Sequence, residues 1–266
     1  MNCRSRNGSP DTGQAIFGDV SSGVPSVIHS QGISDICEAM TPQVIKTDVE
    51  KAGVRKEPVI SRDMLYSIQL DGSTHIISED YAYKSDTYYT ILQQEMGGRV
   101  VRPSSAAVLD AYVVPICLER AHLAGIPVCE WGISQGYAPL PSLVYGLNYF
   151  ASSADYSVIH DSEKGKEIIK HITNKGKYPF CFQKLKDGAE ITTTVSIFGK
   201  TMDTGPGIAE LAHQVYELFA IPLVTIVFVR YGDRCCLSSL SPTRYSRLSV
   251  AERTLITAYI SHQEFL

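Results

Sequence analysis

Cysteine and histidine side chains are among the most reactive groups in this chain, and their spacing suggests two kinds of chemistry. Cys129 precedes Glu130 and lies near His122 in sequence, which suggests a thiol nucleophile with a histidine base. The vicinal pair Cys235 and Cys236 suggests a site for a soft metal ion. Nothing in the sequence places His122 against Cys129, however, and neighbouring strand residues point to opposite faces. We therefore favour core packing for Cys129 and disfavour a vicinal chelate.

A second candidate is the stretch LVTIVFVRYGDRCCLSSLSP, residues 223–242. Two runs typical of strands flank a turn at Gly232 and Asp233, which predicts an antiparallel hairpin. Asp233 is the only acid of this stretch. Because Mg²⁺ requires oxygen ligands, the strands of this hairpin offer no carboxylate for a metal site.

Two further segments allow either a binding role or a structural one. TGPG, residues 204–207, precedes a helical pattern and could form an anion-binding nest, but we favour a turn capped by Thr204. The tyrosines of EDYAYKSDTYY, residues 79–89, could stack on a flat ligand or a partner. We favour partial burial of these rings against helix and loop.

The elements that must position these residues begin with a strand, a helix and a strand. HIISEDY (75–81) predicts a strand after a turn at LDGS, and SDTYYTILQQEMGG (85–98) predicts a helix capped by Ser85 or Asp86. RVVRP (99–103) predicts a second short strand. This order predicts parallel pairing in an open α/β sheet.

The remaining chain also alternates between helices and strands. From Ser104 to Gly125 a helical pattern is interrupted by Pro115, which predicts a kink or a restart. Predicted strands at SLVYGLNYF, YSVIHD, YPFCFQKL and EITTTVSIFG are accompanied by predicted helices at SEKGKEIIKHITN and IAELAHQVYELF. After the hairpin, Ser249 and Glu252 predict a capping box at the start of a last helix.

The order of these segments resembles the RimK-like branch of the ATP-grasp superfamily. HIISEDYAYKSDTYYTILQQEMGGRVVRP is similar to the end of that family's small pre-ATP-grasp domain, and LERAHLAGIPV is similar to the helix and GIP turn that follow it. FCFQKLKDGAEITTT is similar to the family's glutamine hinge. FAIPLVTIVFV and CLSSLSP are similar to its closing motifs, and the resemblance covers about residues 60–262.

This resemblance implies an α/β fold of the α+β ATP-grasp type. A small α/β pre-ATP-grasp domain, residues 16–103, would be followed by a shortened, two-lobed ATP-grasp domain with mixed sheets, residues 104–266. Residues 1–15 are small, polar and contain Gly and Pro, so we expect a disordered N-terminal tail. The role of residues 1–60 is left open.

The resemblance also implies a hinge that contacts adenine. In this family the hinge presents backbone groups to the base, and the matching positions here are Gln183, Lys184 and Leu185. A strand with a polar edge is the alternative. ATP is thus an implied ligand, with or without Mg²⁺.

The family's metal ligands have no counterpart in this sequence. The Asp position falls at Val227, and the Glu-x-Asn pair falls at Leu237 and Ser239 or one residue later. Valine and leucine cannot bind Mg²⁺, and a single serine is a poor substitute. We therefore predict no metal site at these positions.

The positions that would face phosphate differ in the same way. The family's helix lysine aligns near Ala111 or Tyr112, the strand lysine near Tyr145 and the arginine after the hinge at Thr192. The loop LNYFASSADYS, residues 147–157, has no glycine where the family has a glycine-rich loop. The positive charge that offsets a developing phosphoryl charge is therefore absent at these positions.

Two functions from different classes follow. The first is a catalytically degenerate ATP-grasp protein, a pseudoenzyme that binds a nucleotide, a peptide or a protein partner. The alternative is an active ATP-dependent carboxylate–amine ligase that forms an amide through an acyl phosphate. Its metal ligands would then be acids elsewhere, such as Asp203, Glu190 or Asp233, of which Asp233 is the weakest because a hairpin tip lies away from a cleft floor.

Composition excludes some partners. The net charge of −4 and pI near 6 lack the concentrated basic face of a nucleic-acid-binding protein. No apolar run reaches the roughly 18 residues of a membrane helix. The cysteines are odd in number, scattered and without a CxxC pair, which favours reduced thiols in the cytoplasm. The sequence gives no indication of oligomeric state.

Overall fold

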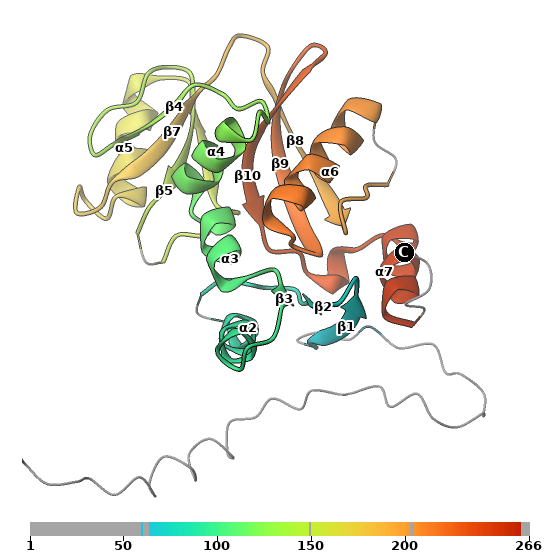
Figure 1. The fold of residues 1–266 in the computed structure, drawn as a ribbon. Coiled ribbons are helices and arrows are strands. Elements are labelled where there is room, and N and C mark those ends of the chain that lie inside the picture. Colours follow the sequence, from blue (N-terminus) through green and yellow to red (C-terminus); the bar gives the residue numbers. More distant parts are fainter. Residues whose placement is uncertain (1–59, 61–63, 84, 149, 203–204, 262–266) are drawn as a thin grey trace, which may run out of the picture. The chain divides into compact units, whose positions relative to one another are not determined.

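A computed structural model describes residues 60, 64–83, 85–148, 150–202 and 205–261 (Figure 1). Every described residue belongs to one compact unit, which ends at Leu266. The expected tail at 1–15 therefore lies outside the described residues. No described helix is long and apolar enough to cross a membrane.

The first sheet has three strands in the order β1-β2-β3. β1 (Tyr66–Leu70) and β2 (Ser73–Ile77) form an antiparallel hairpin, and β3 (Val101–Arg102) pairs parallel to β2. Helix α2 (Asp86–Met96) connects β2 and β3, with Ser85 as its N-cap. The predicted parallel pair is confirmed, whereas the sheet as a whole is mixed because β1 runs antiparallel.

The helical stretch after β3 is divided in two. Helix α3 (Ser105–Tyr112) ends at Val113, and α4 (Val114–Leu123) starts there with Pro115 in its first turn. Proline is tolerated in a first turn because the missing N–H would have no partner within the helix. Of the predicted kink or restart, the structure has the restart.

The second sheet has four strands in the order β4-β7-β5-β6, and every neighbouring pair is antiparallel. The strands are β4 (Trp131–Ser134), β5 (Ser142–Gly146), β6 (Tyr156–Ile159) and β7 (Phe180–Lys184). Helix α5 (Ser162–Ile172), capped by Asp161, lies between β6 and β7 in sequence. Its residues Ile168, Ile169 and Ile172 pack against the core of this sheet.

The third sheet contains the predicted hairpin. It consists of β8 (Glu190–Ile197), β9 (Leu223–Tyr231) and β10 (Arg234–Ser241), in the antiparallel order β10-β9-β8. The ladder between β9 and β10 shifts register between Leu237 and Ser239, which is a β-bulge.

The remaining elements complete this part of the fold. Helix α6 (Pro206–Phe219) connects β8 and β9. A short 3₁₀ helix (Tyr245–Arg247) precedes α7 (Val250–Ser261). The predicted capping box of α7 is confirmed, because Ser249 N donates to Glu252 Oε2 and Glu252 N donates to Ser249 Oγ.

Residues of β9 alternate between two cores. Val224, Ile226 and Phe228 pack in a cluster with residues of α3, α4 and α6, and these helices lie beside the third sheet in Figure 1. Val229 belongs to a different cluster, with Leu143 of β5 and other side chains of the second sheet. The third sheet thus has a helix-covered face and a face that packs on the second sheet.

Candidate functional site

The three positions that the sequence matched to the family's metal ligands, Val227, Leu237 and Ser239, lie on both faces of the third sheet. Val227 and Ser239 are direct partners across β9 and β10, so their side chains share a face. Leu237 pairs with Phe228 and lies in the helix-covered cluster. The β-bulge between Leu237 and Ser239 separates these two positions onto opposite faces.

Ser238 and Ser239 therefore lie where the third sheet meets the second. Ser239 Oγ donates to the carbonyl of Ser153 at 3.2 Å. Ser238 Oγ lies 2.7 Å from Tyr145 Oη, and its carbonyl accepts a bond from Gln183 Nε2 at 3.0 Å. Since these five residues are all buried, the bonds are shielded from water. We call this set, Tyr145, Ser153, Gln183, Ser238 and Ser239, the inter-sheet network.

Tyr145 is the residue near which the sequence predicted the counterpart of the family's strand lysine. It is 1% exposed, and its ring packs with the apolar residues of the second sheet. Burial is the main cause that raises the pKa of its hydroxyl well above the ordinary value, while the bond to Ser238 acts in the opposite direction. The group therefore stays neutral and donates or accepts hydrogen bonds instead of supplying positive charge.

The predicted adenine hinge has internal partners for its donors. Lys184 N donates to Glu130 O at 2.8 Å, and Leu185 N donates to Pro141 O at 2.9 Å. The side chain of Lys184 forms an ion pair with Glu130. Gln183 Nε2 is committed to Ser238, whereas its Oε1 is buried and has no partner among the described residues. One buried acceptor is thus available at this hinge.

The acids named as alternative metal ligands do not gather around Ser239. Glu190 pairs in register with Arg230, three positions from Val227 along β9, and forms an ion pair with it. Alternation along β9 puts this pair on the face opposite Val227. Asp233 lies in the hairpin turn and Asp203 is outside the described residues. Within the described ranges, no three His, Cys, Asp or Glu side chains form a group that could hold a metal ion.

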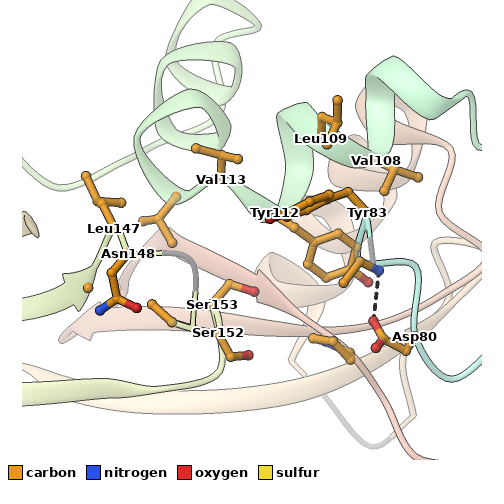
Figure 2. Close-up of a pocket in the computed structure, with 15 residues that line it drawn as sticks. Asp80, Tyr83, Val108, Leu109, Tyr112, Val113, Leu147, Asn148, Ser152 and Ser153 are labelled. Atoms are coloured by element: carbon orange, nitrogen blue, oxygen red, sulfur yellow. Dashed lines mark hydrogen bonds between the residues drawn. The ribbon is translucent and has the colours of Figure 1, made fainter. Parts of the chain in front are cut away.

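A pocket of about 380 Å³ lies at the ends of β5 and β10, and Figure 2 shows its lining. One part of the lining comes from α3 and the junction with α4, and another comes from the loop between β5 and β6. Its apolar residues include Val108, Leu109, Val113, Val114 and Leu147. Its polar residues include Asp80, Tyr112, Asn148, Ser152 and Ser153. We call this the Tyr112 pocket.

The Tyr112 pocket brings together positions that the sequence assigned to the phosphate side. The sequence matched Ala111 or Tyr112 to the family's helix lysine, and it matched the loop 147–157 to the family's glycine-rich loop. The pocket is lined by Tyr112, by residues of that loop and by Pro242, which ends the CLSSLSP motif. Asp80 was not predicted as a site residue. The only feature of the sequence that pointed to it was its position in the tyrosine-rich segment, residues 79–89. Tyr83 of that segment also lines the pocket, whereas Tyr81 is a core residue.

The electrostatics of the Tyr112 pocket suit neutral or basic groups. Asp80 is the only charged side chain among its described lining residues, and Asp80 Oδ1 accepts a bond from Ala82 N at 2.8 Å. The Tyr112 hydroxyl is buried and without a partner in the described chain. Burial is the main cause that raises its pKa, followed by Tyr81 and Asp80. A phosphate would therefore meet a carboxylate here, not a cation.

The remaining sequence candidates have other surroundings. His122 is exposed in the last turn of α4 and forms no hydrogen bond with Cys129 within the described residues. The Cys129 thiol instead lies 3.4 Å from Tyr231 Oη. Helix α6 has Gly205 as its N-cap, and Thr204 lies outside the described residues.

Comparison with known proteins identifies relatives of this arrangement. The family model of the RimK-like ATPgrasp N-terminal domain matches residues 153–259. The search of curated proteins gave no match. Among solved structures, a RimK domain protein ATP-grasp from Sphaerobacter thermophilus DSM 20745 superposes with a TM-score of 0.51 at 16% identity, over 66% of this chain and 75% of that one. D-alanine–D-alanine ligase from Bacillus anthracis superposes with a TM-score of 0.51 at 11% identity, over 67% of this chain and 72% of that one.

These findings confirm the fold class and the family relationship expected from the sequence. The structural likeness at such low identity concerns the fold alone, whereas the family match includes the hinge and the β9–β10 hairpin. The chain has the ATP-grasp fold, and its residues 153–259 match the RimK-like ATPgrasp N-terminal domain.

Proposed function

We propose that this protein is a catalytically degenerate ATP-grasp protein that binds a peptide or protein partner. The observation that carries this proposal is the inter-sheet network. At the positions that the sequence matched to the family's metal and phosphate sites, Ser238 is hydrogen-bonded to Tyr145 and Gln183 of the second sheet, and Ser239 is hydrogen-bonded to the loop residue Ser153. The residues there are neutral and supply neither carboxylates for Mg²⁺ nor cations for phosphate.

Separating the two sheets to admit a triphosphate would be costly. A buried polar group that loses its partner costs about 1–3 kcal/mol, and the network contains several such groups. A nucleotide would have to replace these bonds with its own, without the metal bonds that active members of the family use. The hydrogen-bonded contact between the second and third sheets therefore favours a protein that binds a partner over one that transfers a phosphoryl group.

The Tyr112 pocket is the proposed partner site. Two of its apolar lining residues, Leu109 and Val113, are 37% and 38% exposed, and Ile116 of α4 is 41% exposed. These three side chains extend the apolar surface from the pocket along the helices. Such an extended surface fits a peptide segment, with an apolar side chain in the pocket and a basic or neutral group near Asp80.

A nucleotide is the second ligand class, and one observation favours it. Gln183 Oε1 is buried without a partner, so an adenine amino group could donate to it. In that case we propose Gln183, Lys184 and Leu185 as the adenine contacts, and ATP would bind without a metal-dependent reaction.

We also propose that the protein is located in the cytoplasm, since the described cysteines are all free thiols.

The proposal can be tested by selecting binders from a displayed random-peptide library on the purified full chain. We expect apolar peptides with a nearby basic residue, and Val113→Trp, which fills the pocket mouth, should weaken their binding at least about tenfold. Leu123→Trp is the matched control, because Leu123 is 73% exposed on α4 and does not line the pocket.

Equal binding of the peptides by wild type and Val113→Trp would show that they do not bind at the Tyr112 pocket.

A parallel assay incubates the protein with ATP, Mg²⁺, amino acids and hydroxylamine, which traps acyl phosphates as hydroxamates. Hydroxamate formation above a protein-free control would establish the active ligase and reject the degenerate scaffold.

A further inference from the structure

Strand β8 forms one edge of the third sheet, and Figure 1 shows it beyond β9 on that side. Within the described residues, no other strand pairs with the outer side of β8. Residues 190–195 of this strand are all exposed or half-buried. The backbone N–H and C=O groups that point away from β9 therefore have no strand partner in the described chain. Such groups pair readily with a further strand.

A tight turn at the end of β8 begins a hairpin that the described chain does not complete. Ile197 and Lys200 exchange two backbone hydrogen bonds of 2.9 Å around Phe198 and Gly199. These two central residues have positive φ angles of 49° and 76°, which is typical of the type I′ turn of a β-hairpin. The next described element after Lys200 is helix α6. The outer side of β8 is thus a strand position that the described chain leaves unfilled.

The β8 edge lacks the features that usually prevent strands of different molecules from pairing, which are lysine, proline, bulges and short strands. β8 is eight residues long, contains neither lysine nor proline, and pairs with β9 without a register shift. Its single charged residue, Glu190, lies at its start and forms an ion pair with Arg230. The opposite edge of the same sheet differs, because β10 contains a β-bulge and is bridged to Val128.

The sequence of β8 complements itself in an antiparallel pair centred on Thr193. The opposing residues of two copies are then Ile191 with Val195, Thr192 with Thr194, and Glu190 with Ser196. Opposing β-branched side chains and threonine pairs stabilise neighbouring strands. No two like charges meet, because the only charged residue of the strand lies opposite a serine. A two-fold axis through the centre repeats every contact, as in an isologous dimer.

We propose that this protein forms a two-fold symmetric dimer in which β8 pairs antiparallel with β8 of a second copy, with Thr193 on the axis. The pairing joins two three-stranded sheets into one continuous sheet of six strands. Backbone hydrogen bonds supply the affinity, and the opposing side chains set the register. Because one strand of each copy makes the contact, we expect a reversible dimer with a dissociation constant of about 1–100 µM.

Analytical ultracentrifugation of the purified full chain at increasing concentration, up to about 200 µM, tests the dimer. We expect the wild type to pass from monomer to dimer. Thr193 is exposed, and Thr193→Lys should raise the dissociation constant at least about tenfold, because two like charges then lie opposite each other. Gln93→Lys is the matched control, since it adds the same charge at an exposed position of α2.

A mixture of two variants tests the register. Thr193→Asp should also weaken self-association, for the same reason as Thr193→Lys. An equimolar mixture of Thr193→Lys and Thr193→Asp should form dimers again, because opposite charges then meet on the axis. In the wild type, hydrogen exchange of the β8 amides should slow as the protein concentration rises through the dissociation constant.

Several results would overturn the proposal. A wild type that stays monomeric at about 200 µM would leave the β8 edge to a strand of another kind, such as an extended peptide. A dimer whose β8 amides exchange as fast as those of the monomer would assign the contact to a different surface. Failure of the variant mixture to associate would exclude a pair centred on Thr193. Because the wild-type measurements can refute the dimer by themselves, a variant that fails to fold does not leave the proposal untested.

Discussion

The bond between Tyr145 and Ser238 offers the sharpest test of the inter-sheet network. Tyr145→Phe removes one oxygen and keeps the ring in its apolar cluster, leaving a buried Ser238 hydroxyl without this partner. An unsatisfied buried hydroxyl costs about 1–2 kcal/mol of unfolding free energy. Ser238→Ala should cost a similar amount, because the buried Tyr145 hydroxyl then loses its partner at 2.7 Å.

A double-mutant cycle isolates the pairwise contribution. Removing both hydroxyls leaves neither group unsatisfied, so the double variant should be more stable than the sum of the single losses implies, by about 1 kcal/mol. Urea unfolding followed by circular dichroism gives each free energy. Tyr156→Phe is the matched control, since Tyr156 is the β6 partner of Tyr145 in the same sheet and is only half-buried.

The cycle can refute the reasoning directly. If Tyr145→Phe costs no more than Tyr156→Phe, and the coupling between Tyr145 and Ser238 is within error of zero, the two sheets are not held by this bond. The cleft would then open at little cost, and the argument against nucleotide entry would lose its energetic basis.

Two further predictions concern buried positions. Burial, followed by the charge of Arg102, lowers the pKa of His75 to about 4, below the 6.5 of an exposed histidine. Between these pH values the unfolded chain therefore binds more protons at this residue than the folded chain does. The free energy of unfolding contains a contribution of about 2–3 kcal/mol from this difference, which is present above pH 6.5 and is lost as the pH falls toward 4. Urea unfolding at pH 5 and pH 7 should show a smaller difference for His75→Gln than for wild type, and equal differences would contradict the assignment. Leu237→Glu should lower the free energy of unfolding by about 3 kcal/mol or more, because it buries an unpaired charge on the helix-covered face. Added Mg²⁺ should not restore this stability. A rise in melting temperature that depends on Mg²⁺ would instead place this position in a metal site.

The sequence predicted those features that depend on local signals. The restart at Pro115, the N-cap at Ser85 and the capping box at Ser249 each follow from the preferences of a few neighbouring residues. The order of strands and helices carried the family resemblance, which the fold and the family match confirm. The strand–helix–strand order also predicted the parallel pair of β2 and β3.

Features that depend on contacts between distant segments could not be predicted in this way. The β-bulge that turns Leu237 away from Ser239 depends on pairing with β9, which the β10 sequence does not encode by itself. Asp80 joins the Tyr112 pocket only because the segment after β2 lies near the loop that follows β5. The same reason applies to Cys129, whose thiol lies 3.4 Å from the hydroxyl of Tyr231, a residue of β9 that is distant in sequence.

Calorimetric titration of the purified full chain with ATP, with and without Mg²⁺, shows whether the ATP-grasp site is degenerate. We predict that Mg²⁺ makes no difference to ATP affinity, with either no binding or weak binding that Val113→Trp does not alter. Tight binding that requires Mg²⁺ would contradict it, because the metal would then need ligands that Val227, Leu237 and Ser239 do not provide.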